Sequence, residues 1–318
     1  MSEPQSTPPS GPERPSDASA ARRKPVRRRR ASVQPTLEIT PMHAADCERA
    51  LHWAEQEGWA PGLEDADILA AASPVGGLIA RLDARPAASL SSVRYADRTV
   101  RLGLHICRAA DRGRGLGARV LDHALRRIEA RAVTLDAFPA ASAPYRDRGF
   151  RTQDRIRRYA GVAPAAARFA GHQDQALRPI GLAALDAVDA FDRAATGAPR
   201  RAALSALLAG GATRRVVGLV EDGGLRGWGA VRAARDAYRI APLQAEDEAC
   251  ADRLLAALLA PIAGAPVLLD APNRNAAARR LAERWGLTPT FEVERMTRGE
   301  TADLDETLSF SACALDPF

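Results

Sequence analysis

A glycine-rich turn between a predicted strand and a predicted helix is the sharpest chemical feature of the sequence. It reads Arg112-Gly113-Arg114-Gly115-Leu116-Gly117-Ala118. Without side chains in the way, backbone N–H groups can converge on an anion, and the helix N-terminus adds partial positive charge. The two arginines strengthen this potential, so the turn predicts a site for phosphate or pyrophosphate.

Two other interpretations of this turn stay open. The glycines also fit the dinucleotide fingerprint, with Asp136 at about the expected distance. Against it, residues 108–112 separate the turn from its strand, and the preceding strands form a meander rather than the start of a parallel sheet. The remaining interpretation is a structural turn that binds nothing.

Two motifs together resemble the GNAT superfamily of N-acetyltransferases. Arg112-x-x-Gly115-x-Gly117 resembles the family's acyl-CoA pyrophosphate loop, and Tyr145 followed by Gly149-Phe150 matches its second signature. The resemblance covers about 36–160 and extends to 176–298 as a second lobe, similar to bacterial two-lobe acetyltransferases. One departure is Phe138, because many members carry Asn at that position.

The resemblance implies roles for individual residues. Backbone N–H groups near 104–108 would polarise the thioester carbonyl. Tyr145 would protonate the leaving CoA thiolate as a general acid, the alternative being an aromatic that packs under the sheet. The implied acyl-CoA contacts are Leu104, Ile106, Cys107, Arg112, Gly113, Arg114, Gly115, Leu116, Gly117 and Ala118.

The general base and the acceptor site are less defined. His105 titrates near neutral pH and is one candidate for the base, although a lone strand histidine is also a common structural residue. Asp136 is a second candidate, and water is a third. Trp59, Glu64 and Asp65 lie where the family builds its acceptor wall; the acidic pair would hold a cationic amine, or it simply starts a helix.

Hydrophobic periodicity predicts strands and helices in two lobes, and the resemblance implies that they form an α/β fold with a mixed sheet (α+β). Strands are expected at 36–42, 78–85, 89–96, 99–108, 133–138, 151–160, 214–221, 225–234, 237–242, 266–271 and 289–296, with a first strand and helix of the second lobe within 176–209. Helices are expected at 44–58, after the glycine turn, and at 140–148, 246–260 and 274–285. The predicted divisions are a disordered Arg/Pro/Ser-rich tail (1–35), a catalytic domain (36–160), a linker (161–173), a degenerate lobe (174–300) and a C-terminal extension (301–318).

The two predicted lobes are an internal duplication, so a comparison of their sequences tests which lobe keeps the residues of the site. Adding 134 to the numbers of the first lobe carries Ile106 to Ile240 and Asp136 to Asp270 without a gap. It also converts the glycine turn into residues 246–252, which contain no glycine and four acidic side chains. Asn275, Ala278, Leu281 and Gly286 keep the spacing of the second signature that the resemblance implies, and there the position expected for the tyrosine is Ala282. The second lobe is therefore predicted to be a scaffold, and Asp136 with its counterpart Asp270 to be structural.

Charge and composition limit the other function classes. The formal charge is +6, but eight basic and three acidic residues of the tail account for +5 of it. The folded part is thus nearly neutral, which weakens the case for a nucleic-acid surface outside the tail. The four cysteines lack disulfide or zinc spacing, and no apolar run approaches the roughly 18 residues of a membrane span. A cytoplasmic protein without a metal or a membrane partner is expected.

The function predicted from these features is the transfer of an acetyl group from acetyl-CoA to a primary amine of a small molecule, by direct attack in a ternary complex. A non-catalytic acyl-CoA-binding regulatory module is the alternative, with the Arg-rich tail contacting nucleic acid or a partner. Acetylation of a protein lysine or N-terminus differs only in the acceptor.

Overall fold

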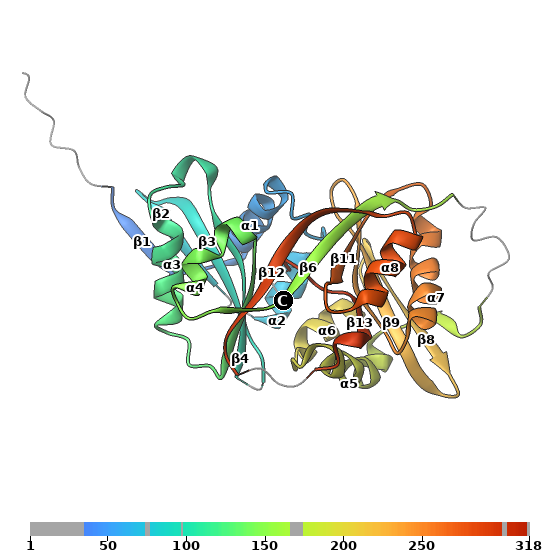
Figure 1. The fold of residues 1–318 in the computed structure, drawn as a ribbon. Helices are drawn as coiled ribbons and strands as arrows, with labels where there is room; N and C mark the ends of the chain where they lie inside the picture. The colour runs from blue at the N-terminus through green and yellow to red at the C-terminus, as the bar shows by residue number, and fades with distance from the viewer. Residues whose placement is uncertain (1–34, 74–76, 97, 166–173, 301–303, 317–318) are drawn as a thin grey trace, which may run out of the picture. The chain divides into compact units, whose positions relative to one another are not determined.

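The computed structural model describes residues 35–73, 77–96, 98–165, 174–300 and 304–316 (Figure 1). The tail predicted over 1–35 lies outside these ranges except for Pro35, and so does most of the predicted linker. The first half of the folded chain contains β1 (Leu37–Pro41), α1 (Ala44–Gln56), α2 (Asp65–Ala72), β2 (Gly77–Leu82), β3 (Arg85–Arg94), β4 (Thr99–Cys107), α3 (Leu116–Leu125), β5 (Ala132–Ala137), α4 (Ala143–Arg146) and β6 (Arg151–Val162). The second half contains β7 (Leu177–Pro179), α5 (Leu185–Thr196), α6 (Arg201–Leu208), β8 (Arg214–Glu221), β9 (Gly224–Ala233), β10 (Tyr238–Ala245), α7 (Glu248–Leu259), β11 (Pro266–Pro272), α8 (Ala276–Arg284), β12 (Thr288–Gly299) and β13 (Ser309–Ser311).

The predicted mixed α/β fold is confirmed, with three local differences from the expected elements. Helix α2 was not among the expected elements, although Asp65 starts it as the helix-start interpretation requires. The single helix expected before residue 209 is two helices, because Gly197 adopts a left-handed φ of 66° and ends α5. The C-terminal extension contains a strand, β13, that the sequence pattern does not predict.

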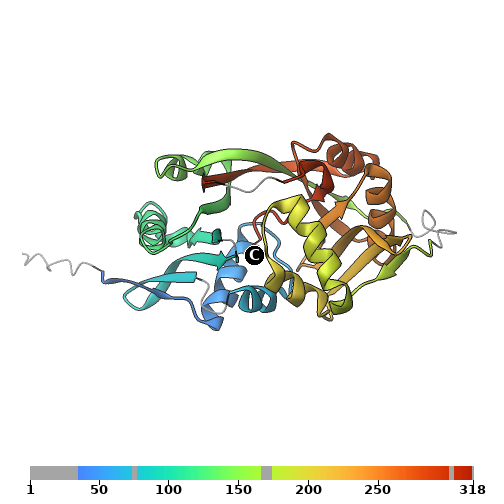
Figure 2. The same cartoon turned by 90° about the horizontal axis from the view of Figure 1, so that it is seen from below.

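All strands join one sheet, in which the last strands of the two halves have changed places. The order is β1-β2-β3-β4-β5-β12-β6-β11-β10-β9-β8-β7, with β13 beside β10. Strand β12 pairs antiparallel with β5, and β6 pairs antiparallel with β11. Figures 1 and 2 show β6 and β12 side by side as they cross between the halves. The predicted boundary at 161–173 therefore divides the sequence but does not divide the sheet.

Each exchanged strand carries an arginine to a buried aspartate of the other half. Arg295 on β12 binds both carboxylate oxygens of Asp136 at 3.0 and 3.2 Å, and Arg101 binds the same carboxylate from β4 at 2.5 Å. Arg158 on β6 binds Asp270 on β11 in the same bidentate manner, at 2.7 and 2.8 Å. A buried charge is costly to leave unpaired, so these contacts favour the exchanged pairing.

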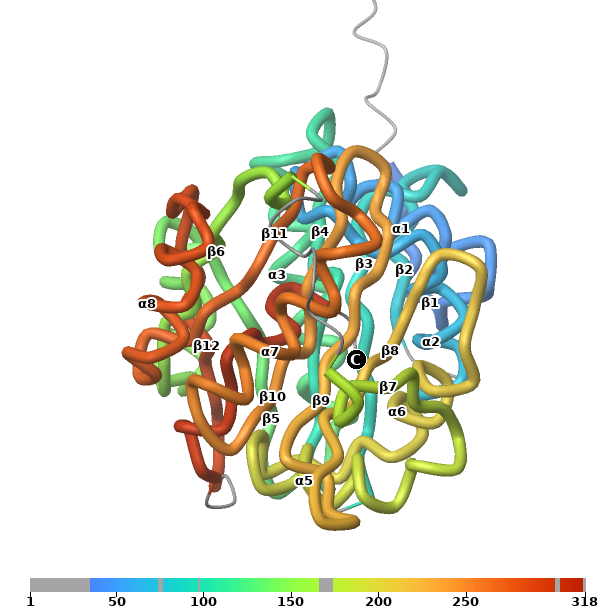
Figure 3. Tube along the Cα trace, turned by 90° about the vertical axis from the view of Figure 1, so that its right-hand side faces the viewer, coloured from blue at the N-terminus to red at the C-terminus, as the bar shows by residue number. Residues whose placement is uncertain are grey.

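Helices of both halves share one hydrophobic core on the face of the sheet that carries α1 and α2. Leu69 of α2 packs in the same cluster as Leu204 and Leu207 of α6. On the second half, α7 contacts β8, β9 and β10 (Figure 3). In the described part of the chain, no helix is long and apolar enough to cross a membrane.

The structure corrects the gap-free 134-residue register. Arg101 pairs with Thr134 across β4 and β5, and Arg239 pairs with Leu268 across β10 and β11. The strands β4 and β10 are thus related by 138 residues, whereas β5 and β11 are related by 134. The second half is four residues shorter between them, so part of the glycine turn has no counterpart there.

Candidate functional site

A gap between β4 and β5 forms the centre of the candidate site. The two parallel strands pair only from Thr99 to Arg101 on β4, and beyond that point they diverge. Opposite β3, the register of β4 shifts near Leu104, which takes a positive φ of 43°. A cavity of about 90 Å³ lies in the gap and is lined by residues 101–105 of β4, 135–137 of β5 and the following Phe138. The diverging edge of β4 can therefore offer backbone donors to an extended ligand.

Tyr145 and His105 meet at this cavity. The Tyr145 hydroxyl lies 2.6 Å from His105 Nδ1, and both residues line the cavity wall. The Tyr-x-x-x-Gly-Phe motif explains how the phenol is held. Gly149 has a φ of 84°, which turns the chain after α4. The Phe150 ring then packs edge-on against the Tyr145 ring, with 6.2 Å between the ring centroids. The structure thus brings together both predicted catalytic residues.

Their hydrogen bonds fix the protonation of the pair. His105 Nε2 lies 2.9 Å from the Gly117 carbonyl, which can only accept, so Nε2 carries the hydrogen. His105 Nδ1 is then the acceptor of the Tyr145 O–H. Removal from water lowers the pKa of His105, assisted by the nearby Arg148 charge. Burial raises the pKa of Tyr145 to about 12. At neutral pH both side chains are therefore uncharged.

The lowered pKa of His105 predicts a stability change with pH. Below about pH 6.5, the ordinary histidine value, the unfolded chain binds a proton that the folded His105 resists. Stability contributed by neutral His105 is therefore present above pH 6.5 and is lost as the pH falls toward the folded pKa. We expect His105→Gln to flatten the fall in Tm between pH 7.5 and 5.5. The exposed His52→Gln variant is the control, and equal slopes in H105Q and wild type would contradict the expectation.

The glycine turn has the geometry of an anion cradle. Gly113 and Gly115 have φ values of 74° and 73°, and no atom lies within 4 Å of an added Cβ at either position. Gly115 is the N-cap of the ten-residue helix α3 and provides no side-chain cap, so the first helical N–H groups are left for a ligand. A Cβ on Gly117 would lie 3.3 Å from His105 Nε2. This glycine therefore lets the cradle and the catalytic pair approach closely.

A buried carboxylate organises the charges around the cradle. Asp111 binds Arg85, Arg108 and Arg114 at 3.2, 2.6 and 3.1 Å. Arg112 pairs with Glu57 and donates to the Cys107 carbonyl. Four guanidinium groups thus face two carboxylates, which leaves an excess of positive charge for a pyrophosphate. Asp111 and Arg85 were not among the predicted site residues. Asp111 could have been found from the sequence, because it lies three residues from Arg108 and three from Arg114.

The acidic pair predicted to hold a cationic amine, Glu64 and Asp65, instead binds arginines of the second half of the chain. Glu64 binds the Arg214 side chain at 2.9 Å and the Ala212 amide at 2.8 Å. Asp65 is 1% exposed and binds Arg232 at 2.5 Å. These carboxylates join α2 to the second half of the chain, so the acceptor-binding assignment is corrected for both.

Of the other residues predicted to belong to the site, some line the cavity and some are buried away from it. Trp59 lines the cavity, and the centroid of its ring lies 6.4 Å from that of Phe138. Leu104 lies on the cavity wall, whereas Ile106 is buried in the core shared with α1 and α2. Burial favours the neutral form of Asp136, but Arg101 and Arg295 outweigh it and hold the pKa of Asp136 well below its usual range. A carboxylate locked in this way is a poor base, which agrees with the structural role predicted for it.

The described residues of the second half form no equivalent cradle. Strand β10 ends at Ala245 and α7 starts at Glu248, so only two residues separate them. The Asp247 carboxylate accepts from the Cys250 amide at 2.8 Å and caps this helix, which opposes an anion there. Ala282 is fully buried at the position expected for the tyrosine.

Comparisons with known proteins found a family model and a curated relative. A family model described as "Acetyltransferase (GNAT) domain" matches residues 188–311, in the half without the cradle. The chain is 30% identical over 254 residues to a protein named Holothin acyltransferase from Pseudoalteromonas sp. (strain SANK 73390), an alignment that covers 78% of this chain and 83% of the relative.

Two solved structures are similar in fold. A putative acetyltransferase from Pyrococcus horikoshii has a TM-score of 0.72 at 20% identity, covering 88% of this chain and 95% of its own. A tandem GNAT protein from the clavulanic acid biosynthesis pathway has a TM-score of 0.58 at 17% identity, covering 85% and 100%. At these identities the likeness concerns the fold alone.

Proposed function

Because this chain belongs to the GNAT family and is an acyltransferase of that kind, we propose that it moves an acetyl group from acetyl-CoA to a primary amine of a small molecule, in the first half of the chain. The observation that carries the proposal is the Tyr145–His105 pair at 2.6 Å in the gap between β4 and β5. The pair lies next to an anion cradle in the first half, and neither has a counterpart among the residues that the structure describes in the second half. A small-molecule acceptor is proposed on the likeness to Holothin acyltransferase.

The positive charges of the first half indicate where acetyl-CoA would bind. The N-terminus of α3, with Gly113 and Gly115, would hold the pyrophosphate, and the arginines around Asp111 would add to its attraction. The pantetheine arm would then extend along β4 into the gap. Backbone N–H groups near Leu104 would polarise the thioester carbonyl.

The proton balance defines the role of Tyr145. The amine nitrogen forms a bond to the carbonyl carbon, the carbon–sulfur bond breaks, the amine loses one proton and the thiolate gains one. A phenol with a pKa of about 12 is a weaker acid than a thiol with a pKa near 8.5. Tyr145 therefore has to receive the amine proton as it passes its own to sulfur. His105 is a positioning residue that holds the phenol through Nδ1 in the free protein. For the transfer, the single phenol hydrogen would turn from Nδ1 to the sulfur.

A ligand titration followed by an acceptor panel tests this proposal. Acetyl-CoA at 100 times its Kd is expected to stabilise the protein by about 2.7 kcal/mol, measured as a thermal shift. Primary amines are then screened for release of free CoA thiol. No shift at millimolar acetyl-CoA would overturn the proposal. A shift without thiol release for any amine would favour the non-catalytic binding module instead.

Reversing the charge of the cradle is expected to weaken acyl-CoA binding. The double variant Arg112→Glu/Arg114→Glu imitates the acidic counterpart in the second half. Removing each arginine–phosphate hydrogen bond is expected to raise the Kd of acetyl-CoA on the order of tenfold, because hydrogen bonds between charged groups are the strong ones. Isothermal titration at two salt concentrations measures this. The matched control, Arg178→Glu/Arg215→Glu, makes the same charge change on exposed strands, and an equal loss of affinity there would contradict a local effect.

A further inference from the structure

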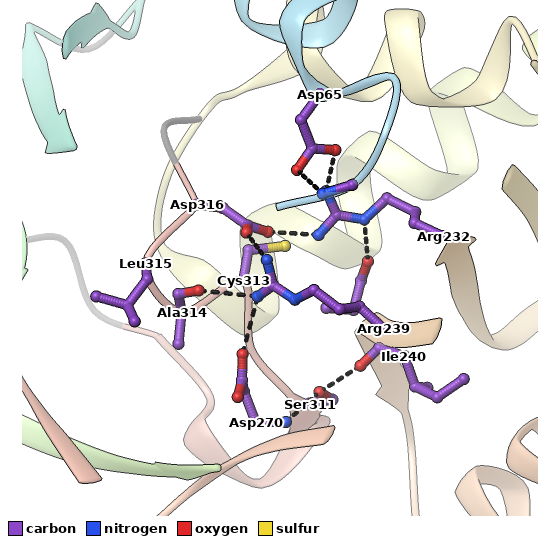
Figure 4. A network of polar contacts seen from close by, with 12 residues as sticks. Asp65, Arg232, Arg239, Ile240, Asp270, Ser311, Cys313, Ala314, Leu315 and Asp316 are labelled. Carbon is purple, nitrogen blue, oxygen red and sulfur yellow. Dashed lines mark hydrogen bonds and ion pairs between the residues drawn. The ribbon is translucent and has the colours of Figure 1, made fainter. Parts of the chain in front are cut away.

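The C-terminal strap, residues 309–316, occupies the second half's counterpart of the catalytic gap. Strands β10 and β11 pair only up to Ile240 and Leu269, and β13 pairs with β10 beyond that point. Ser311 Oγ donates to the Ile240 carbonyl at 2.6 Å and accepts from the Asp270 amide at 3.0 Å (Figure 4). One serine hydroxyl therefore bridges the two diverging strands. The chain's own backbone takes the position that a ligand would need in this half.

After leaving this gap, the strap reaches the catalytic gap of the first half. The Leu315 amide donates to Asp136 Oδ2 at 3.0 Å, and Leu315 and Asp316 line the 90 Å³ cavity. Ala312 and Cys313, earlier in the strap, line a larger cavity of about 340 Å³. The strap thus contributes to the walls of both cavities.

The strap is held firmly at its end. Asp316 is 1% exposed and binds Arg232 at 2.5 Å and also Arg239 (Figure 4). Arg239 donates in addition to the Ala314 carbonyl at 2.8 Å. Between these anchors, Leu315 adopts a left-handed φ of 59°. Such a conformation costs free energy in a branched residue and persists where surrounding contacts enforce it, often at functional sites.

Leu315 lies near the closed end of the catalytic gap, where β4 and β5 still pair. Its amide is bound to Asp136, which follows Leu135 on β5, and β4 and β5 still pair at Arg101. A pantetheine arm that enters from the cradle, at the opposite end of β4, would point its acyl group toward this closed end. Leu315, which lines the cavity and packs with Ile156 and Val293, therefore borders the space into which a longer acyl chain would extend.

We infer that Leu315 sets the size of the acyl group that the enzyme accepts. The second half, although it lacks a cradle, thereby takes part in specificity through the strap that it anchors. The inference rests on the proposed acyl-CoA site in the first half. A wall residue of this kind acts by excluding methylene groups, each worth about tenfold or more in discrimination.

The test compares binding of acetyl-CoA and hexanoyl-CoA, which requires no acceptor. In Leu315→Ala we expect the Kd for hexanoyl-CoA to fall at least tenfold relative to the Kd for acetyl-CoA. Leu315→Phe should shift the ratio in the opposite direction. Leu315→Gly, which suits the left-handed φ of this position, provides a second variant in case the alanine variant does not fold. The exposed Leu182→Ala is the matched control.

The outcomes separate this inference from the proposed function. If wild type binds neither acyl-CoA, the proposed function fails. If folded wild type binds acetyl-CoA and the ratio is unchanged in both Leu315→Ala and Leu315→Gly, only the inference about Leu315 is overturned.

Discussion

Replacing Tyr145 with phenylalanine is expected to lower kcat by about 10²- to 10⁴-fold, the usual contribution of general acid–base catalysis. The change removes one hydroxyl and keeps the ring that packs against Phe150. The path of the proton to the CoA thiolate is lost, while the cradle at Gly113 and Gly115 is untouched. The Kd of acetyl-CoA is therefore expected to stay within about twofold of wild type.

Steady-state kinetics with the best amine of the panel, together with a titration of acetyl-CoA, measures both quantities. Tyr238→Phe, which removes a phenol from β10 in the second half, is the control and should leave kcat unchanged. A Y145F variant that keeps the wild-type kcat would remove Tyr145 from the mechanism. A large rise in Kd with unchanged kcat would instead assign the hydroxyl to binding.

Replacing Asp270 with asparagine is expected to lower the free energy of unfolding by about 3–5 kcal/mol, the usual cost of breaking a buried ion pair. Asp270 is 2% exposed and binds Arg158 at 2.7 and 2.8 Å and Arg239 at 2.9 Å. An asparagine fits the space, but it leaves the buried Arg158 guanidinium without a carboxylate and leaves Asp316 as the remaining carboxylate of Arg239. The clamp between the exchanged strand β6 and β11 is then lost.

The urea midpoint and the Tm report this change. Asp186→Asn is the control, because its carboxylate is 92% exposed and pairs with Arg201 on the surface. Such pairs contribute about 1 kcal/mol or less. Equal effects in D270N and D186N would contradict a role of the buried clamp in stability.

The strands and helices could largely be predicted, because each follows from a local pattern of apolar side chains. The alternation from Val100 to Cys107 produces β4, and the glycines after it start α3 where expected. The roles of Glu64 and Asp65 could not be predicted, because their partners Arg214 and Arg232 are 150 and 167 residues away. An acidic pair at a helix start has the same sequence pattern whether it faces a ligand or another part of the chain.

The sequence by itself determined the cradle and the phenol that define the first half. Left-handed glycines, a helix start and Tyr145 before Gly149-Phe150 are local requirements that a few neighbouring residues satisfy. Only the tertiary structure decided which strands pair and what lines the catalytic gap. A strand has the same alternation whichever neighbour it pairs with, so neither the exchange of β6 and β12 nor the hydrogen bond of Leu315 to Asp136, 179 residues apart, leaves a local signal.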